Sequence, residues 1–458
     1  MDSMLTSAPS TRAPADERQP RHYELDWCRA FVVLVLIPFH AAGLFTATAG
    51  QYFGTRSSSP ISLSLLATVG VWGISLLFLI AGAGACFALE RRTPRQFISE
   101  RCLRLLIPFA FATLTLIPLQ DYAILHAFPG VLGQVAVPGW DQHIADSPVA
   151  FYPRYLSSYL SFLTHYAPGQ EIVFWSHLYF IPRLLVISLV ALPLLLALRS
   201  GRGRRLTARC AVLCERHRGA VFLLALPLGL LQAALGWQWQ TWQTGAGTDG
   251  FNELAQFMCY GIAFVYGYLL YSDERLRRAA QRDSLLALPL LLFIFVPTQL
   301  PGVGNPALSH DYSAGGLLAA FLRAFAAWLW VLAAIGLAMR YLAFTNRLGR
   351  YLTEASYPLY MLHLPVLYLL LLALPQLLTG QAYALLRYLA IVTLTFAITL
   401  AVYELLIRRI PPLRVLFGLR LRLLPASARA VSRKTVWVKE RRAKGETTGE
   451  RGERGTRT

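Results

Sequence analysis

The stretch RAFVVLVLIPFHA, from Arg29 to Ala41, decides the fold of this chain. It is one of many apolar runs of about 20 residues, the length at which a helix crosses the hydrocarbon core of a bilayer. These runs lack the two-residue alternation of a barrel strand, and backbone groups cannot stay unpaired in lipid. The sequence therefore predicts an all-α fold, a polytopic integral membrane helix bundle.

The composition supports the membrane class. The chain has 458 residues, of which 55% are hydrophobic and 15% charged, a balance that excludes a pair of soluble domains. The net charge of +19 is spread through short loops and a tail, which argues against nucleic acid as a partner. Six scattered cysteines suggest no disulfide framework. Cys210, Cys214 and His217 have loose metal-ligand spacing without a fourth ligand nearby, so we predict no metal site and no bound cofactor.

Arginines in alternate loops predict the orientation. The loops that follow the even-numbered apolar spans are rich in arginine, whereas the other loops contain almost none. By the positive-inside rule the arginine-rich loops and both termini face the cytoplasm, and we expect a multi-pass protein of a bacterial cytoplasmic (inner) membrane. About ten transmembrane helices are predicted, at 28–50, 61–89, 102–120, 174–198, 219–236, 253–271, 284–300, 314–339, 353–375 and 383–407.

The membrane core, predicted at 28–407, lies between two polar segments. Residues 1–27 are expected to form a flexible cytoplasmic lead, and 408–458 a disordered basic tail that rests on anionic lipid headgroups. A long outer loop at 121–173 has the length of a cap over an outward cavity, and an ordinary linker fits it equally well. A cleaved signal peptide is the alternative for the first span, but acidic residues in the lead argue against it.

Polar residues in the first span indicate a site. Arg29 and His40 are eleven residues apart, close to three helical turns, so they share one stripe with His40 about 16 Å deeper. His40 lies near the bilayer centre and needs a polar partner or a water-filled cavity. Asp26 can orient Arg29 through an i, i+3 pair, and Pro38 frees backbone groups beside His40. The alternative is structural: a histidine bonded to a neighbouring helix and a topology arginine.

Two further clusters point to the same cavity. In RCLRLLIP, Arg101 and Arg104 share one helical face, which suits a phosphate-bearing ligand, although topology charges look alike. In ASYPLYMLHLPV, His363 falls at a depth similar to that of His40. Tyr360 lies one turn before His363, and Tyr357 lies close to a second turn. Together the histidines predict a polar chamber near the midplane.

These motifs resemble those of the membrane acyltransferase 3 family, and the chain looks closest to the branch that includes periplasmic glucan succinyltransferases. Two positions depart from the family pattern, because Ala81 stands before Gly82 where a serine is frequent, and Tyr179 replaces a tryptophan. The motifs that carry the resemblance are Asp26 and Arg29 with His40, LLFLIAG at 76–82, RCLRLLIP at 101–108, HLYFI at 177–181 and YPLYMLHLPV at 357–366.

The resemblance implies an acyltransferase. It would move an acyl group, acetyl or succinyl, from cytoplasmic acyl-CoA as co-substrate to a hydroxyl of an extracytoplasmic carbohydrate or glycolipid. His40 would be the catalytic histidine and Arg29 its positioning partner, with Asp26 orienting Arg29. Arg101 and Arg104 would bind the phosphates of the donor.

The residues leave the mechanism open. A neutral His40 can act as a general base, which typically contributes about 10²–10⁴-fold, or it can carry the acyl group itself. On the outer side, His177, Arg183 and the long loop are expected to bind the acceptor. The main rival is a transporter or flippase of a glycan or lipid precursor, in which His40 and His363 relay protons. That class often shows repeats or paired broken helices, and none is evident here.

Overall fold

The computed structural model describes residues 21–43, 60–127, 147–165, 174–235, 250–295, 314–374 and 383–419. In these ranges the chain is helical and contains no strand. The main helices are α1 (Tyr23–Gly43), α3 (Pro60–Arg91), α4 (Pro94–Ala127), α6 (Pro148–Thr164), α8 (Phe180–Val190), α9 (Leu192–Arg199), α10 (Gly201–Arg216), α11 (Ala225–Leu235), α13 (Gly250–Ser272), α14 (Glu274–Phe295), α15 (Ala314–Tyr341), α16 (Arg347–Ala373), α17 (Ala384–Val402) and α18 (Pro411–Leu416).

The all-α membrane fold is confirmed, with fewer spans than the ten predicted. Seven helices of the described ranges are long and apolar enough to cross a bilayer, or eight if the bent pair Ser176–Val190 and Leu192–Arg199 forms one span. The predicted fifth span corresponds to Ala220–Leu235, which is shorter than a membrane crossing. The predicted seventh span falls on α14, whose six charged residues all lie in its first half, and residues 296–300 of that span lie outside the described ranges.

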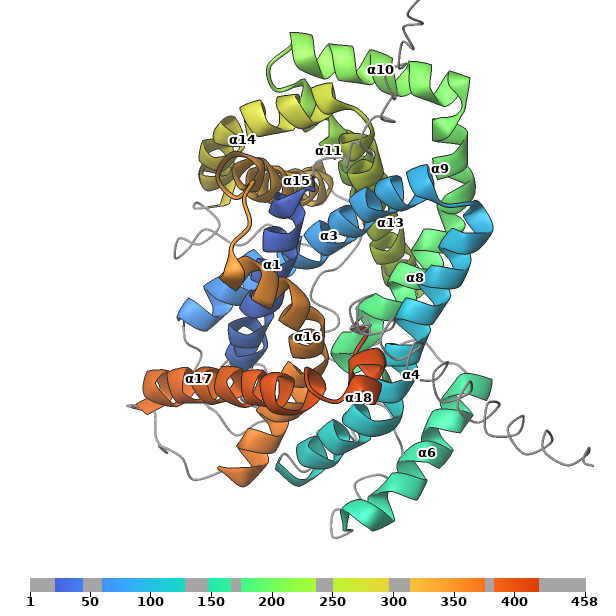
Figure 1. Ribbon diagram of the computed structural model, residues 1–458. Coiled ribbons are helices and arrows are strands. Elements are labelled where there is room, and N and C mark those ends of the chain that lie inside the picture. The colour runs from blue at the N-terminus through green and yellow to red at the C-terminus, as the bar shows by residue number, and fades with distance from the viewer. Residues whose placement is uncertain are drawn as a thin grey trace, which may run out of the picture.

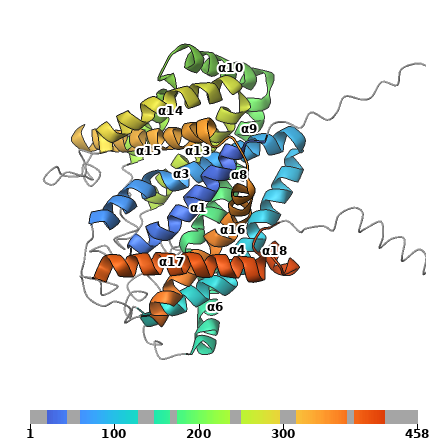
Figure 2. The ribbon, with the colours of Figure 1, turned by 60° about the vertical axis from the view of Figure 1, so that its left-hand side comes forward.

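Helix α1 lies in the middle of the bundle. It packs against α3 on one side and α16 on the other, and α17 crosses beside it (Figure 1). Figure 2 shows α14, α15, α3, α1 and α17 stacked one after another, and the contacts between successive helices agree. Val32, Ala41 and Ala42 are fully buried, whereas Phe31 is 54% exposed, so most of α1, though not every side of it, faces protein. The polar side chains of this helix therefore lie inside the bundle.

Two glycines fix the crossing of α3 and α13. A Cβ at Gly82 would overlap the carbonyl oxygen of Phe264, and a Cβ at Gly267 would overlap the carbonyl oxygen of Leu79. Small residues at such positions let two membrane helices approach backbone to backbone. The crossing holds α3 in place as the wall behind α1.

The predicted outer loop contains ordered helices. Helix α4 continues to Ala127, so the first part of the loop at 121–173 is helical, and α6 packs against α4 within the same segment (Figure 1). Tyr155 and Phe162 of α6 contact Phe174, with ring centroids 6.0 and 5.0 Å apart. Residues 128–146 and 166–173 lie outside the described ranges. The cap over an outward cavity stays a prediction.

The chain beyond the last span folds back onto the core. The predicted disordered tail begins at residue 408, but its first part contains α18. Arg414 in this helix is 5% exposed. Its guanidinium lies 2.8 Å from the carboxylate of Glu354 in α16. The ordered core therefore extends to residue 419. At the other end α1 begins at Tyr23, earlier than the predicted boundary, and residues 1–20 and 420–458 lie outside the described ranges.

Candidate active site

Three histidines from three separate segments meet inside the bundle. His40 comes from α1, His363 from α16, and His177 from the short 3₁₀ helix Ser176–Tyr179 that precedes α8. The ring centroids of His40 and His363 are 5.2 Å apart, those of His177 and His363 are 4.8 Å apart, and those of His40 and His177 are 6.5 Å apart. His177 and His363 are 6% and 1% exposed. We call these three rings the histidine cluster.

The backbone of α16 fixes the tautomer of His363. Its Nδ1 lies 2.8 Å from the carbonyl oxygen of Tyr360, and because a carbonyl can only accept, Nδ1 carries the hydrogen and donates. In a neutral ring the lone pair then lies on Nε2. That Nε2 atom is buried and has no hydrogen-bond partner in the described part of the chain. It is available to a proton or to a hydroxyl group.

Tyr360 ties the histidine cluster together. Its hydroxyl donates to the backbone carbonyl of His177, and its ring lies edge-on to the His177 ring at 5.5 Å. Tyr357 stacks on Tyr360 with ring centroids 6.3 Å apart. Because the Tyr360 hydroxyl is used in this bond, the residue positions His177 rather than facing an open cavity.

The turn that carries His177 has an unusual backbone. Ser176 has a φ of 45°, the one positive φ among the non-glycine residues of the described ranges. Such conformations are uncommon and cluster at functional sites. The amide of Gln120 in α4 donates to the Ser176 hydroxyl at 2.9 Å. Helix α4 thus holds the turn that brings His177 to the other two histidines.

A polar connection runs along α1 toward its N-terminal end. Arg29 donates to the Asp26 carboxylate at 3.2 Å, as the i, i+3 spacing predicts, and to the backbone carbonyl of Thr353 at 3.4 Å. Thr353 lies in α16, ten residues before His363. Arg21 binds the other oxygen of Asp26 at 2.9 Å. The polar stripe on α1 is therefore flanked by α16 over its whole length.

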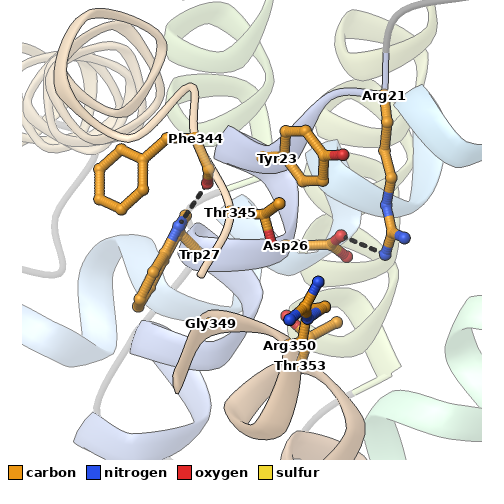
Figure 3. A pocket seen from close by; sticks show the side chains of 9 residues that line it. All are labelled: Arg21, Tyr23, Asp26, Trp27, Phe344, Thr345, Gly349, Arg350 and Thr353. Carbon is orange, nitrogen blue, oxygen red and sulfur yellow. Dashed lines mark hydrogen bonds and ion pairs between the residues drawn. The ribbon is translucent and has the colours of Figure 1, made fainter. Parts of the chain in front are cut away.

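A shallow, open depression lies at this end of α1 (Figure 3). The indole of Trp27 donates to the carbonyl of Phe344 at 3.0 Å and forms one wall. Arg21 and Arg350 both lie at the rim, on either side of Asp26. Guanidinium groups at the rim of such a depression can bind phosphate oxygens. We call this feature the α1 pocket.

The other predicted arginines lie in different surroundings. Arg101 donates to the carbonyl of Ala81 in α3 at 3.1 Å. Arg104 is 53% exposed and lies 3.8 Å from Glu100. Arg183 donates to the side chain of Gln256, and its guanidinium lies 4.8 Å from the Tyr179 ring centre. These contacts join α3, α4, α8 and α13, and the structure does not bring the three arginines into the histidine cluster.

Pro38 lies within the continuous helix α1, two residues before His40, and its carbonyl accepts a hydrogen bond from the Tyr388 hydroxyl at 3.1 Å. The space that this proline was expected to open for a ligand stays a prediction. In the described ranges no group of three or more histidine, cysteine or acidic side chains has the arrangement of a metal site.

Sequence reasoning missed a set of buried polar groups on α4. Asp121 is 1% exposed, and Gln120 and Thr113 are 2% and 0% exposed. Asp121 was assigned to the outer loop, where an acidic residue is ordinary, whereas it lies within α4. The signal that could have found it is a single acidic residue in the apolar run TLIPLQDYAIL. We call Thr113, Gln120 and Asp121 the α4 polar face.

The comparison with protein families gives one match. The profile described as an acyltransferase domain matches residues 22–404. The match includes α1 with Arg29 and His40 as well as His177 and His363, and it extends into the last apolar helix. No curated protein and no solved structure matches the sequence significantly.

Proposed function

Because the chain belongs to the acyltransferase 3 family, we propose that it is a transmembrane O-acyltransferase in which His40 is the catalytic residue. The observation that carries the proposal is the histidine cluster, in which His40 lies 5.2 Å from His363 and 6.5 Å from His177. Placing three imidazoles inside a membrane bundle costs free energy, and ionisable residues in such positions are usually functional. Proton transfer to a buried imidazole is the chemistry that acyl transfer to a hydroxyl requires.

The donor in this proposal is an acyl-CoA that reaches the protein from the cytoplasm. Its nucleotide is highly charged and stays outside lipid, so only its thin pantetheine arm extends toward His40. The distance from Arg29 to His40 along α1 is about 16 Å, at about 1.5 Å per residue. Arg101 and Arg104 are proposed to hold the donor phosphates, and the α1 pocket is a second candidate for that role. The termini face the cytoplasm in this proposal, in line with the loop arginines.

The acceptor is proposed to be a hydroxyl group of an extracytoplasmic carbohydrate or glycolipid. In the general-base route the acceptor oxygen attacks the thioester carbon while its proton passes to His40. The carbon–sulfur bond then breaks, and CoA leaves as the thiol after its sulfur takes back the proton that His40 accepted. In the alternative route the acyl group passes first to a nitrogen of His40 and then to the acceptor. Acetyl and succinyl are both proposed donors, succinyl because of the resemblance to the glucan succinyltransferases.

Mass spectrometry of the cell envelope tests this function. Glycans and lipids from cells with the intact protein are compared with those from cells with His40→Ala, after membrane insertion of both proteins is verified. We expect an acyl mass on an envelope carbohydrate that disappears in the variant. An envelope with the same acyl content in both strains would contradict the assignment. Exposed His217, outside the site, offers the matched control His217→Ala.

The transporter or flippase is not favoured by the family match. A transporter would move an intact precursor without consuming acyl-CoA. Release of free CoA by the purified protein therefore separates the two classes.

A further inference from the structure

The α4 polar face carries hydrogen-bonding atoms that have no partner. Thr113 Oγ1, Gln120 Oε1 and Asp121 Oδ2 are all buried, and each is without a hydrogen bond in the described part of the chain. Buried polar groups are nearly always bonded, and those that are not mark a place for water or a ligand. An acidic side chain inside a membrane helix is expensive and usually functional. Thr113 and Gln120 are seven residues apart and share one side of α4, and Asp121 follows Gln120 directly, so the three groups extend over about two helical turns.

The α4 polar face is joined to the histidine cluster. The amide of Gln120 donates to Ser176, and the next residue is His177, whose ring lies 4.8 Å from that of His363. The backbone carbonyl of Thr113 accepts from the hydroxyl of Tyr155 in α6 at 2.8 Å. The polar face therefore lies between the histidine cluster and the helix of the outer loop.

Asp121 and Arg29 lie on opposite sides of the histidine cluster. Asp121 lies near the hydroxyls of Tyr155 in α6 and Tyr368 in α16. Burial raises the pKa of Tyr155, and the nearby Asp121 raises it further. Tyr368 follows His363 by five residues, about 7.5 Å along the helix, whereas Thr353 at the Arg29 end precedes His363 by ten residues. The histidine cluster thus lies between the Arg29 end and Asp121.

We propose that Thr113, Gln120 and Asp121 form the acceptor subsite and bind an uncharged, hydroxyl-rich group such as a neutral sugar. This inference rests on the proposed acyltransferase function. A carboxylate accepts hydrogen bonds from hydroxyls, and an amide oxygen and a threonine hydroxyl add a second and a third contact. No cationic side chain pairs with Asp121 in the described ranges, so a phosphate or a uronic acid would lie at this point without a counter-charge.

The test compares acceptor use with donor binding in the same variants. Asp121→Asn keeps the size of the side chain, and Thr113→Val removes only a hydroxyl. Thr115→Val is the matched control, because Thr115 is an exposed residue of α4 whose hydroxyl bonds the carbonyl of Phe111 at 2.7 Å. Envelope glycans from cells that carry each variant are analysed for acyl groups. Binding of acetyl-CoA and succinyl-CoA to each purified full-length protein in lipid nanodiscs is measured by calorimetry.

We expect Asp121→Asn to lower acylated glycan by about tenfold or more, a usual loss when one partner of a buried hydrogen bond is replaced, and Thr113→Val to lower it less. Donor dissociation constants should stay within about twofold of the wild type, and the control should acylate normally. The acylated residue should be a neutral sugar.

Unchanged acylation in Asp121→Asn would overturn the subsite, as would donor binding that weakens together with acylation, or an acylated residue that is anionic. A wild-type protein that neither binds a donor nor acylates any glycan would instead refute the acyltransferase function itself. The failure of the subsite and the failure of the function are therefore distinguishable.

Discussion

The chemistry that we propose depends on the imidazole of His40 and on the two rings beside it. When His40 takes a proton, the charge has to be stabilised in a region of low dielectric constant. His363 donates from Nδ1 to Tyr360, so its Nε2 is free to accept a hydrogen bond from a protonated neighbour. At a ring separation of 5.2 Å, His363 is the group best placed to share that charge.

Removal of His363 tests this sharing. We expect His363→Ala to lower the rate of CoA release by at least about tenfold, because His40 loses the neighbour that stabilises its protonated form. Donor binding should persist, since His363 lies ten residues beyond the Arg29 end of the site. The rate is measured with purified protein and a thiol reagent. A variant as fast as the wild type would show that His363 is only a packed core residue.

Two arginine pairs are alternative candidates for binding the donor phosphates. Arg101→Gln combined with Arg104→Gln tests the pair on α4, and Arg21→Gln combined with Arg350→Gln tests the α1 pocket. Loss of a charge-assisted contact should raise the KM for acyl-CoA by about tenfold with little change in kcat, because the contact is made equally in the ground state and the transition state. The pair whose replacement leaves the KM unchanged is thereby excluded from donor binding.

Some of the site could be predicted from single residues, and some could not. The stripe from Arg29 to His40 follows from helical periodicity, and a histidine in an apolar span requires a partner, which led to His363. The sequence predicted His177 only as an outer-side residue. Its contact with the other two histidines depends on the turn at Ser176, which no local pattern reveals. Asp121 was missed because a helix boundary placed seven residues too early turned a buried carboxylate into a loop residue.

At the scale of elements, the packing of α3 against α13 sets the wall behind the site. Gly82 meets the backbone of α13, whereas Gly84 has no atom within 4 Å of the position of its missing Cβ. The same substitution should therefore have opposite effects at two positions of one helix.

The pair Gly82→Ala and Gly84→Ala tests this packing. We expect Gly82→Ala to destabilise the protein by about 1–3 kcal/mol, the usual cost of overpacking, because the backbones must move apart. Gly84→Ala should stabilise it by about 0.5–1 kcal/mol, because alanine loses less backbone entropy in a helix. Thermal unfolding in detergent gives the comparison. Equal midpoints for the two variants would show that α3 and α13 do not cross at Gly82.

The sequence predicts most of the helices, but it predicts less well which of them span the bilayer. Each of the ten apolar runs is largely helical over its described residues, because hydrophobic length and composition are local properties. Whether a helix spans the bilayer depends on how many consecutive apolar residues follow its charged ones. The six charged residues of α14 all lie in its first half, and its end lies at the edge of the described ranges. Helix α18 escaped prediction because it is held by a long-range ion pair between Arg414 and Glu354.

At the scale of the whole molecule, the proposal requires that the donor and the acceptor reach the histidine cluster from opposite sides of the membrane. The arginine-rich helix α10 is expected on the cytoplasmic side and α6 on the outer side. Figure 1 shows these two helices at different ends of the bundle. Their accessibility reports the orientation of the chain.

Cysteine labelling measures that accessibility. Cys210 in α10 is exposed, whereas Cys28, Cys86, Cys214 and Cys259 are buried. With Cys102 replaced by serine, we expect a membrane-impermeant thiol reagent to label Cys210 in inverted vesicles and not in intact spheroplasts. In a second protein, with Cys210→Ser and Ser161→Cys in α6, the labelling should be reversed. Labelling of both positions from the same side would contradict the predicted orientation.

The most direct test of the account is acyl transfer by purified protein in lipid nanodiscs, supplied with radiolabelled acyl-CoA and an extract of envelope glycans. The wild type should release CoA and transfer label to glycan in equal amounts, and His40→Ala should lose at least about 10²-fold of both rates while it remains folded. Label transferred by His40→Ala at the wild-type rate would contradict the claim that the histidine cluster is the catalytic centre.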